Sequence, residues 1–229
     1  SGSGKSTVAR CIVRLVDPTS GSVKISGEEI ATIPLSRLKP HRKRVQIVFQ
    51  DPFRSLNPRI EVGESIIEGP LNFGVSRKQA MKDAGELLEL VGLPRSAIDR
   101  FPHQFSGGQR QRIAIARALA MKPDLLIADE AVSALDVSVQ AQVLRLLDEI
   151  QERMGIAILF ITHDLRVAAQ ICDEVMVMRK GLVVESGPAA EVLANPRTDY
   201  TRSLIEAAPG RHWDFANFRP VSETIAAAR

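Results

Sequence analysis

Hydrophobic and polar positions alternate along this chain with two different periods, which predict helices and strands in turn. Apolar residues recur at helical spacing over residues 8–16, and Asp17-Pro18 predicts the end of that helix. Short apolar runs predict strands instead, and these are VQIVFQ (45–50), LLIAD (125–129) and IAILFIT (156–162). Helices are expected over 106–121 and 137–154, so the chain should form an α/β fold with a mainly parallel sheet.

Two regions depart from this alternation. Between residues 53 and 104 strand patterns vanish, and Ser76 with Gln79 resembles a capping box at the start of an amphipathic helix. We predict a helical insertion there. Residues 174–187 have a hairpin pattern that turns at Lys180-Gly181, and short helices are expected around 189–194 and 200–207.

Composition narrows the class of protein without indicating a function. The chain has 229 residues, of which 45% are hydrophobic and 25% charged, and its formal net charge is +3. This balance is ordinary for a globular protein with one sizeable core, and the mild charge does not argue for binding to nucleic acid. No apolar run is long enough to predict a membrane span, so we expect any work at a membrane to be that of a peripheral subunit.

The chain begins with SGSGKST, which matches the end of a phosphate-binding loop. The full pattern is G-x-x-x-x-G-K-[ST] between a strand and a helix, and its first glycine would precede Ser1. Two interpretations are open at this point: a phosphate loop whose first part lies outside the chain, or a Gly/Ser linker before Lys5. A phosphate loop needs the helix predicted next, because a helix N-terminus attracts anions.

A pair of carboxylates ends the apolar run at 125–129. An Asp at a strand tip can hold Mg²⁺ through its water shell, while the hydroxyl of a phosphate loop binds the ion directly. These residues would be Asp129 and Ser6, and Glu130 could then activate the attacking water. The alternative is a charged strand end that faces solvent, which leaves Lys5 and the loop unexplained.

The stretch FSGGQRQR (105–112) is the most specific motif. A serine and two glycines at a helix start offer a hydroxyl and backbone N–H groups to phosphate, although Ser106 could also be a plain N-cap. SGGQ resembles the signature motif of ATP-binding-cassette (ABC) ATPases, SALD (133–136) their D-loop and ITHD (161–164) their switch histidine. Gln50 stands where the family has its Q-loop. With the phosphate loop, five motifs follow the family's order across nearly the whole chain, which excludes the linker.

The resemblance implies a P-loop NTPase core with a mainly parallel sheet plus a helical subdomain that carries the signature. We divide the chain into a core at 1–52 and 122–187, a helical subdomain at 53–121, and a C-terminal helical extension and tail at 188–229. The strand that feeds the loop is missing, so the core would be incomplete at its N-terminus and we expect the chain to be a fragment.

The resemblance also implies ATP and Mg²⁺ as cofactors. The residues that would wrap the phosphates are Gly2, Ser3, Gly4, Lys5, Ser6 and Thr7, with the lysine reaching the β and γ groups. Mg²⁺ and its waters would be arranged by Ser6, Gln50 and Asp129. Glu130 would act as the general base, and His163 would contact the γ-phosphate.

A second ABC ATPase subunit is implied by the signature. The residues that would address the γ-phosphate of a nucleotide bound to the opposite subunit are Ser106, Gly107, Gly108 and Gln109. Asp136 would bridge the two subunits. Phe105 stands where the family usually has Leu, and Ala131-Val132 where Pro-Thr is common. Neither departure removes a catalytic group, so we expect activity to persist.

Longer stretches indicate a subfamily. The segments that look like oligopeptide and dipeptide importers are 48–59, 129–144 and 195–209, and nickel and glutathione importers are near relatives. The expected partners are integral membrane permease subunits, a second ATPase subunit (identical or not) and, indirectly, a periplasmic or extracellular solute-binding protein. No nucleic acid is expected. The place would be the cytoplasmic face of the inner membrane, as a peripheral protein.

Two other functions stay open on the sequence alone. One is a soluble ABC ATPase that acts on ribosomes or DNA, and the other is a non-catalytic nucleotide-binding regulator, against which Glu130 and His163 argue. The last residues carry Trp213, Phe215 and Phe218. They would pack against the body of the protein or contact a partner subunit.

Overall fold

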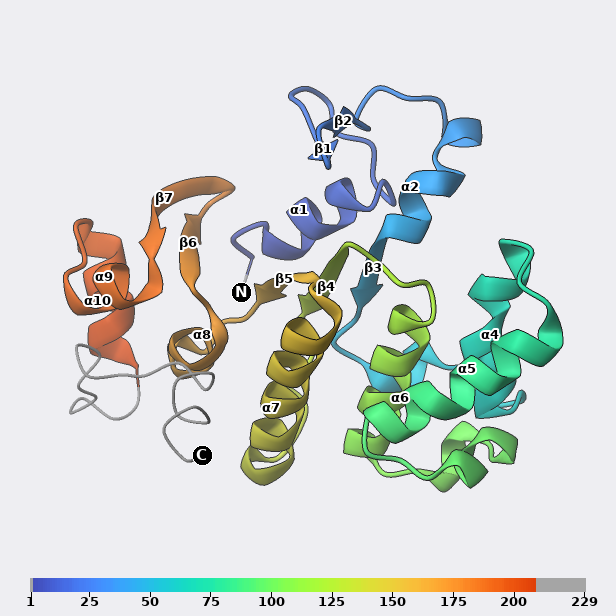
Figure 1. Cartoon of the computed structure of the whole chain (residues 1–229). Helices are drawn as coiled ribbons and strands as arrows, with labels where there is room; N and C mark the ends of the chain where they lie inside the picture. The colour runs from blue at the N-terminus through green and yellow to red at the C-terminus, as the bar shows by residue number, and fades with distance from the viewer. Residues whose placement is uncertain (1, 209–229) are drawn as a thin grey trace. The chain divides into compact units, whose positions relative to one another are not determined.

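The computed structural model describes residues 2–208 (Figure 1). These residues form two compact units, one of residues 10–159 and one of residues 2–9 with 160–208. Helix α1 (Lys5–Ile12) and strand β5 (Ala157–Ile161) each contain residues of both units. The aromatic residues of the tail named above lie outside the described residues, and the division into core, helical subdomain and extension stays a prediction.

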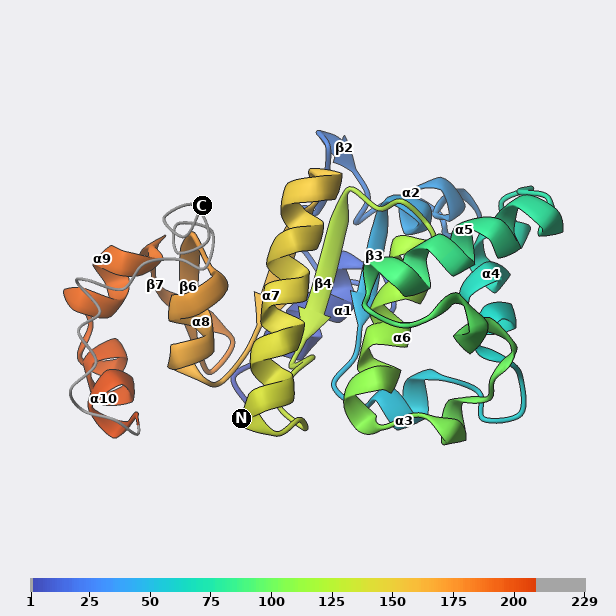
Figure 2. The same cartoon turned by 60° about the horizontal axis from the view of Figure 1, so that its bottom comes forward.

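Two parallel strands, β3 (Val45–Val48) and β4 (Leu125–Asp129), lie side by side in the larger unit (Figure 2). Their register pairs Val45 with Leu125, and the order of the sheet is β3-β4-β5. Residues 126–128 of β4 are at most 1% exposed. A strand that is apolar on both faces must be covered on both faces, which is why LLIAD is a continuous apolar run. The predicted α/β fold with a parallel sheet is confirmed.

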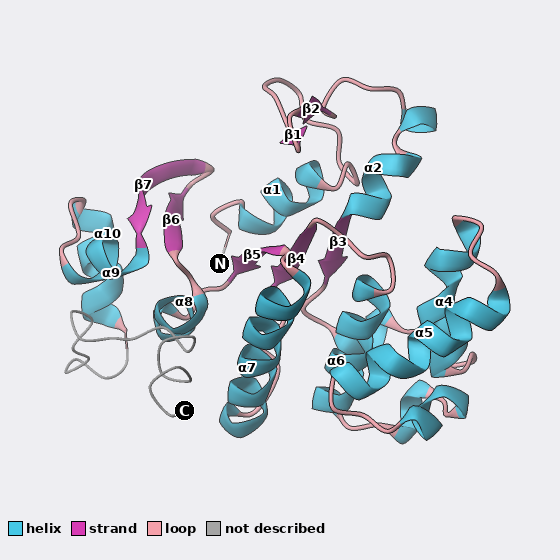
Figure 3. Cartoon of the chain, viewed as in Figure 1, coloured by secondary structure: helices cyan, strands magenta, loops and turns pink. Residues whose placement is uncertain are grey.

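Only helices occur between β3 and β4, as predicted for the insertion (Figure 3). They are α3 (Pro52–Ser55), α4 (Val62–Asn72), α5 (Arg77–Leu90) and α6 (Gly107–Leu119), with the short 3-10 helices η2 (Arg95–Asp99) and η3 (Pro102–Gln104). Helices α4, α5 and α6 pack on one another, and the largest apolar side chains that they bury completely or nearly so are Ile66, Ile67, Leu88, Ile113, Ile115 and Leu119.

Helix α5 has only half of the predicted capping box. The Ser76 hydroxyl accepts from the Gln79 N–H at 3.3 Å, as an N-cap should. The Gln79 side chain does not complete the box, because its amide donates to Asp83 at 2.6 Å, four residues along the helix.

The first helix is shorter than the sequence predicts. Helix α1 ends at Ile12, and Arg14 takes a left-handed backbone with φ of 53°. Its guanidinium donates to the Asp17 carboxylate at 2.9 Å and to backbone carbonyls between residues 30 and 33. These bonds hold the chain in a turn, and Leu15 is left 57% exposed. The apolar spacing that extended the predicted helix past Ile12 was misleading.

The larger unit contains further elements. Its other elements are β1 (Lys24–Ile25), β2 (Glu28–Glu29), η1 (Leu35–Arg37), α2 (Lys39–Arg44) and α7 (Val137–Met154). Helix α7 has the predicted bounds. Gly155 ends it with φ of 63°, a conformation that glycine adopts at little cost.

The smaller unit contains the predicted hairpin and the C-terminal helices. Its elements are α8 (Leu165–Ile171), β6 (Glu174–Arg179), β7 (Leu182–Pro188), α9 (Ala189–Ala194) and α10 (Asp199–Ala207). The hairpin turns at Lys180 and Gly181, whose φ values of 49° and 83° match the left-handed turns that suit the twist of two strands. No helix among residues 2–208 combines the length and the apolar character that crossing a bilayer requires.

Candidate functional site

The phosphate-binding loop belongs to the smaller unit. Gly2 and Gly4 have φ of 81° and 94°, which side chains rarely allow. The Lys5 ammonium donates to the Ser3 hydroxyl at 3.2 Å, and the Gly181 N–H donates to the Ser3 carbonyl at 3.0 Å. The hairpin turn thus holds the loop. Since α1 begins at Lys5, the positive end of a helix dipole directly follows the glycines, an arrangement that suits phosphate.

The two predicted carboxylates lie at the tip of β4 in the larger unit. Asp129 is 6% exposed, and Glu130 has a left-handed backbone with φ of 50°. Such a conformation costs about 1–3 kcal/mol for a residue with a side chain, so neighbouring contacts must hold it. The Glu130 carbonyl accepts from the N–H of Ser133 at 3.1 Å and from its hydroxyl at 3.0 Å. The turn therefore fixes Glu130 immediately after a buried strand.

Gln50 contacts this same turn. Its side-chain amide donates to the Ser133 hydroxyl at 3.2 Å. Asp51 follows and caps α3 by accepting from the backbone N–H of Phe53 at 2.9 Å. The Ser133 hydroxyl thereby joins Gln50 to Glu130, and both of these residues are predicted to serve one nucleotide. From the sequence alone, Ser133 had no predicted role of its own. The signal for it was the spacing, since Ser133 lies three residues after Glu130, where a polar side chain can close a turn.

The predicted signature begins helix α6 with a full capping box. The Gln109 N–H donates to the Ser106 hydroxyl at 3.3 Å, and the Ser106 N–H donates to the Gln109 side chain at 3.0 Å. Ser106 is therefore an N-cap, which was the structural alternative to a phosphate contact. The two roles are compatible, because the box holds the first turn of α6 and with it the backbone N–H groups of Gly107 and Gly108.

The start of α6 lies against the start of α7. A Cβ atom added to Gly108 would lie 2.3 Å from Cγ1 of Val139, a distance at which one residue must move. Asp136 caps α7 by accepting from the Val139 N–H at 3.0 Å, and that bond together with the Ser138 hydroxyl lowers the pKa of the Asp136 carboxyl. The larger unit thus brings the signature glycines and the predicted D-loop together.

His163 lies in the smaller unit, in the loop between β5 and α8. It is exposed, and the residues on either side are bonded to each other, since the Asp164 N–H donates to the Thr162 hydroxyl at 3.0 Å. Asp164 also caps α8 and accepts from the Arg166 guanidinium, and that bond lowers the pKa of its carboxyl. The backbone around the histidine is therefore well held.

The predicted Mg²⁺ donors are a hydroxyl, an amide and one carboxylate, from Ser6, Gln50 and Asp129. This set suits Mg²⁺, which keeps several waters and uses few protein ligands together with substrate phosphates. Within residues 2–208, no cluster of three or more His, Cys, Asp or Glu side chains could hold a metal ion by itself. Ser6 belongs to the smaller unit and the other two to the larger one.

The two departures from the family pattern are accommodated in the larger unit. Phe105 is 5% exposed, and the Arg100 guanidinium lies 4.3 Å from the centre of its ring, a cation–π contact. Ala131 and Val132 are each 2% exposed. All three positions take an apolar side chain into the interior, and none of them carries a polar group that a catalytic role would need.

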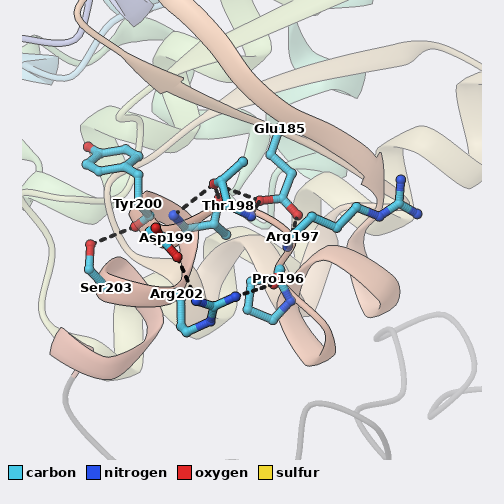
Figure 4. Close-up of polar contacts among 9 residues, drawn as sticks. Glu185, Pro196, Arg197, Thr198, Asp199, Tyr200, Arg202 and Ser203 are labelled. Atoms are coloured by element: carbon cyan, nitrogen blue, oxygen red, sulfur yellow. Dashed lines mark hydrogen bonds and ion pairs between the residues drawn. The ribbon is translucent and has the colours of Figure 1, made fainter.

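A second polar cluster joins strand β7 to helix α10 in the smaller unit (Figure 4). Glu185 is 8% exposed, and its carboxylate accepts from the Arg197 N–H at 2.8 Å and from both the N–H and the hydroxyl of Thr198. The Thr198 hydroxyl also caps α10 by accepting from the Thr201 N–H at 3.2 Å. These bonds, that from Arg197 foremost, lower the pKa of Glu185 from its ordinary 4.5 to about 2. The sequence pattern gave no sign of this cluster beyond one acidic residue in a largely apolar strand.

We expect Glu185→Gln to loosen helix α10, because an amide offers one acceptor atom where the carboxylate offers two. The folded pKa lies below the ordinary value, so the carboxylate stabilises the fold fully above about pH 4.5 and loses that effect as the pH falls toward 2. Hydrogen exchange at neutral pH should be faster in residues 197–207 of the variant. Thermal melts at a series of pH values should show parent and variant converging as the pH falls through this window.

Glu191→Gln is the matched control. Glu191 pairs with the Arg197 guanidinium, but both side chains are about half exposed or more, and exposed pairs contribute little. If exchange over 197–207 is the same in both variants and the parent, the cluster does not hold α10.

Comparisons with known proteins identify the relatives of this chain. The family model described as ABC transporter matches residues 1–133. A Brucella ovis protein named as a peptide import ATP-binding protein is 47% identical over 210 residues, which are 91% of this chain and 66% of that protein. A peptide ABC transporter ATP-binding protein of Sinorhizobium fredii is 52% identical over 91% of this chain and 60% of its own length. The chain thus spans less than two thirds of these relatives.

The chain is also similar to solved structures of ABC proteins. The structure of cbiO1 from Clostridium perfringens, part of the ABC transporter complex cbiONQ, matches with a TM-score of 0.77 and 32% identity over 85% of this chain and 76% of that one. A dimeric ATP-binding cassette in a post-hydrolysis state, bound to ADP and Pi, matches with a TM-score of 0.72 and 32% identity, over 82% of this chain and 81% of that one. Because the family model covers more than half of the residues, the chain belongs to the ABC transporter family.

Proposed function

We propose that this chain is the ATP-binding and ATP-hydrolysing part of a transporter that imports a solute, and that the solute class is di- and oligopeptides. The observation that carries the proposal is the turn at the tip of β4. There Asp129 ends a buried strand, and the carbonyl of the next residue, Glu130, is joined to the Gln50 side chain through the Ser133 hydroxyl. The names of the relatives at 47% and 52% identity support peptides as the solute.

The phosphates of ATP would lie on the loop of residues 2–7, with Lys5 against the β and γ groups. Ser6, Gln50 and Asp129 would hold Mg²⁺ and its waters, and the bound ion would neutralise charge on the phosphates. Glu130 would take the proton of the attacking water, since the held turn fixes its backbone and its carboxylate is a base. His163 would contact the γ-phosphate.

The signature would complete the site of a second cassette. Ser106 and the N–H groups of Gly107 and Gly108 would address the γ-phosphate held by the partner's loop, with Gln109 keeping the helix start in place. Asp136 would bridge the subunits. Two ATP molecules would then hold two cassettes together, and hydrolysis would release them, which is how closing and opening could drive membrane subunits. Catalysis in such a site consists mainly of positioning and electrostatics.

The partners follow from this role. We infer integral membrane permease subunits, a second ABC ATPase subunit, and a solute-binding protein that acts through the permease. The place would be the cytoplasmic face of the cell membrane, as a peripheral protein.

The test is assembly with the membrane subunits of a peptide importer. We expect the protein to co-purify with them in detergent, and ATP hydrolysis by the reconstituted complex to rise when a peptide-loaded solute-binding protein is added. Nickel and glutathione serve as control solutes, and stimulation by one of them instead would correct the solute class alone. Sedimentation with ribosomes or DNA, and not with membrane subunits, would contradict the import function.

A further inference from the structure

One hydroxyl group joins Gln50 to the turn that follows β4. The Ser133 hydroxyl donates to the Glu130 carbonyl at 3.0 Å, and its oxygen accepts from the Gln50 side-chain Nε2–H at 3.2 Å. The Ser133 N–H donates to the same carbonyl at 3.1 Å, which closes the turn. All three residues belong to the unit of residues 10–159.

The bonding capacity of a serine decides which end of the Gln50 amide faces it. A hydroxyl has one proton, and here the Glu130 carbonyl takes it. Toward Gln50 the hydroxyl can then only accept, so it selects the NH₂ end of the amide. The carbonyl oxygen Oε1 must point elsewhere, because both atoms are carried by one planar group. Oε1 is the only atom of this side chain that can bind Mg²⁺ or accept from its water.

We propose that Ser133 is a positioning residue that sets the orientation of the Gln50 amide, so that Oε1 and not Nε2 is presented to Mg²⁺ and its waters. The inference rests on the proposed function. The same hydroxyl helps to hold Glu130, whose φ of 50° needs support. One side chain therefore positions both the amide that faces the metal and the residue proposed as the base.

The first measurement is the Mg²⁺ dependence of Ser133→Ala. A single neutral hydrogen bond contributes about 0.5–1.5 kcal/mol, which corresponds to a change of about two- to tenfold. We therefore expect the Mg²⁺ concentration needed for half-maximal hydrolysis to rise by that factor. ATP binding in EDTA, followed with a fluorescent ATP analogue, should stay at the parent level, because without Mg²⁺ the orientation of the Gln50 amide has no ion to act on. The same titration with Mg²⁺ present should show weaker binding.

Three variants separate positioning from folding. Ser133→Thr keeps the hydroxyl and should restore the Mg²⁺ response. Ser96→Ala removes an exposed serine hydroxyl from η2 and should match the parent. Gln50→Ala with Ser133→Ala should need no more Mg²⁺ than Gln50→Ala alone, because the amide that Ser133 orients is already gone.

Two results would overturn the inference. One is a Ser133→Ala variant with the parent's Mg²⁺ response, and the other is equal loss in the Ala and Thr variants together with a lower melting temperature, which would indicate a purely structural role. Failure of the parent protein to hydrolyse ATP would count against the proposed function instead, and the binding titrations with and without Mg²⁺ would still test Ser133.

Discussion

Glu130→Gln should retain ATP binding and lose nearly all hydrolysis. The amide preserves the size of the side chain and leaves the backbone bonds of the turn to Ser133 unchanged. It cannot take a proton from the attacking water, and removal of a general base typically costs a factor of about 10²–10⁴. Steady-state release of phosphate and equilibrium binding of ATP to parent and variant are the two measurements.

The same variant should accumulate as an ATP-bound dimer. In the proposed cycle hydrolysis opens the dimer, so blocking that step leaves the closed state in place. Size-exclusion chromatography with light scattering, with and without MgATP, reports this directly. Glu149→Gln is the matched control, because Glu149 lies in α7 and is half exposed beside Arg153. A Glu130→Gln variant that hydrolyses ATP at the parent rate, or that stays monomeric in ATP, would remove Glu130 as the base.

Elements whose ends are set by local chemistry were the ones that the sequence predicted best. Helix α7 runs over the predicted residues because Asp136 caps its start and Gly155, with φ of 63°, ends it. Strand β4 is predicted from its apolar residues because a strand covered on both faces cannot tolerate a polar side chain until its tip. In both cases the residues that set the ends of the element lie within the element or directly next to it in the chain.

Features that depend on distant residues were missed or misjudged. The early end of α1 depends on Arg14, whose guanidinium bonds to carbonyls near residue 30, and hydrophobic spacing carries no information on that contact. The Glu185 cluster needs Thr198, which lies 13 positions further along the chain. The hydrogen bond between Gln50 and Ser133 joins residues that are 83 positions apart. Such contacts exist only once the fold has brought the segments together.

In the candidate site, too, local motifs could be predicted from the sequence and contacts between distant residues could not. Motif order was enough to name Lys5, Asp129 and the signature residues, since each motif is contiguous and has its own chemistry. Motif order could not show that Ser106 and Gln109 bond to each other, or that Gly108 lies against Val139. Those contacts explain why glycine is needed at position 108: a side chain there would push the signature and the start of α7 apart. The catalytic roles themselves stay predictions.

Ser106→Arg should abolish hydrolysis while leaving ATP bound to the phosphate loop. The arginine would occupy the space proposed for the partner's γ-phosphate, and it would remove the hydroxyl that caps α6. Lys5→Ala should abolish hydrolysis for the opposite reason, because the loop loses its cation while the signature stays intact. A dimer made of either variant alone would therefore have no complete composite site.

A mixture of these two variants should hydrolyse ATP faster than either one alone. In the proposed heterodimer the loop of the Ser106→Arg subunit would face the intact signature of the Lys5→Ala subunit, so one composite site would be whole. The control mixes Lys5→Ala with the double variant Lys5→Ala/Ser106→Arg, in which no intact loop exists and no activity should return. Co-purification of the two variants through different affinity tags must first show that heterodimers form. If they form and the mixture still hydrolyses no more ATP than the sum of its parts, then a site shared between two cassettes is insufficient. Either both sites must be intact together, or the signature acts within its own chain.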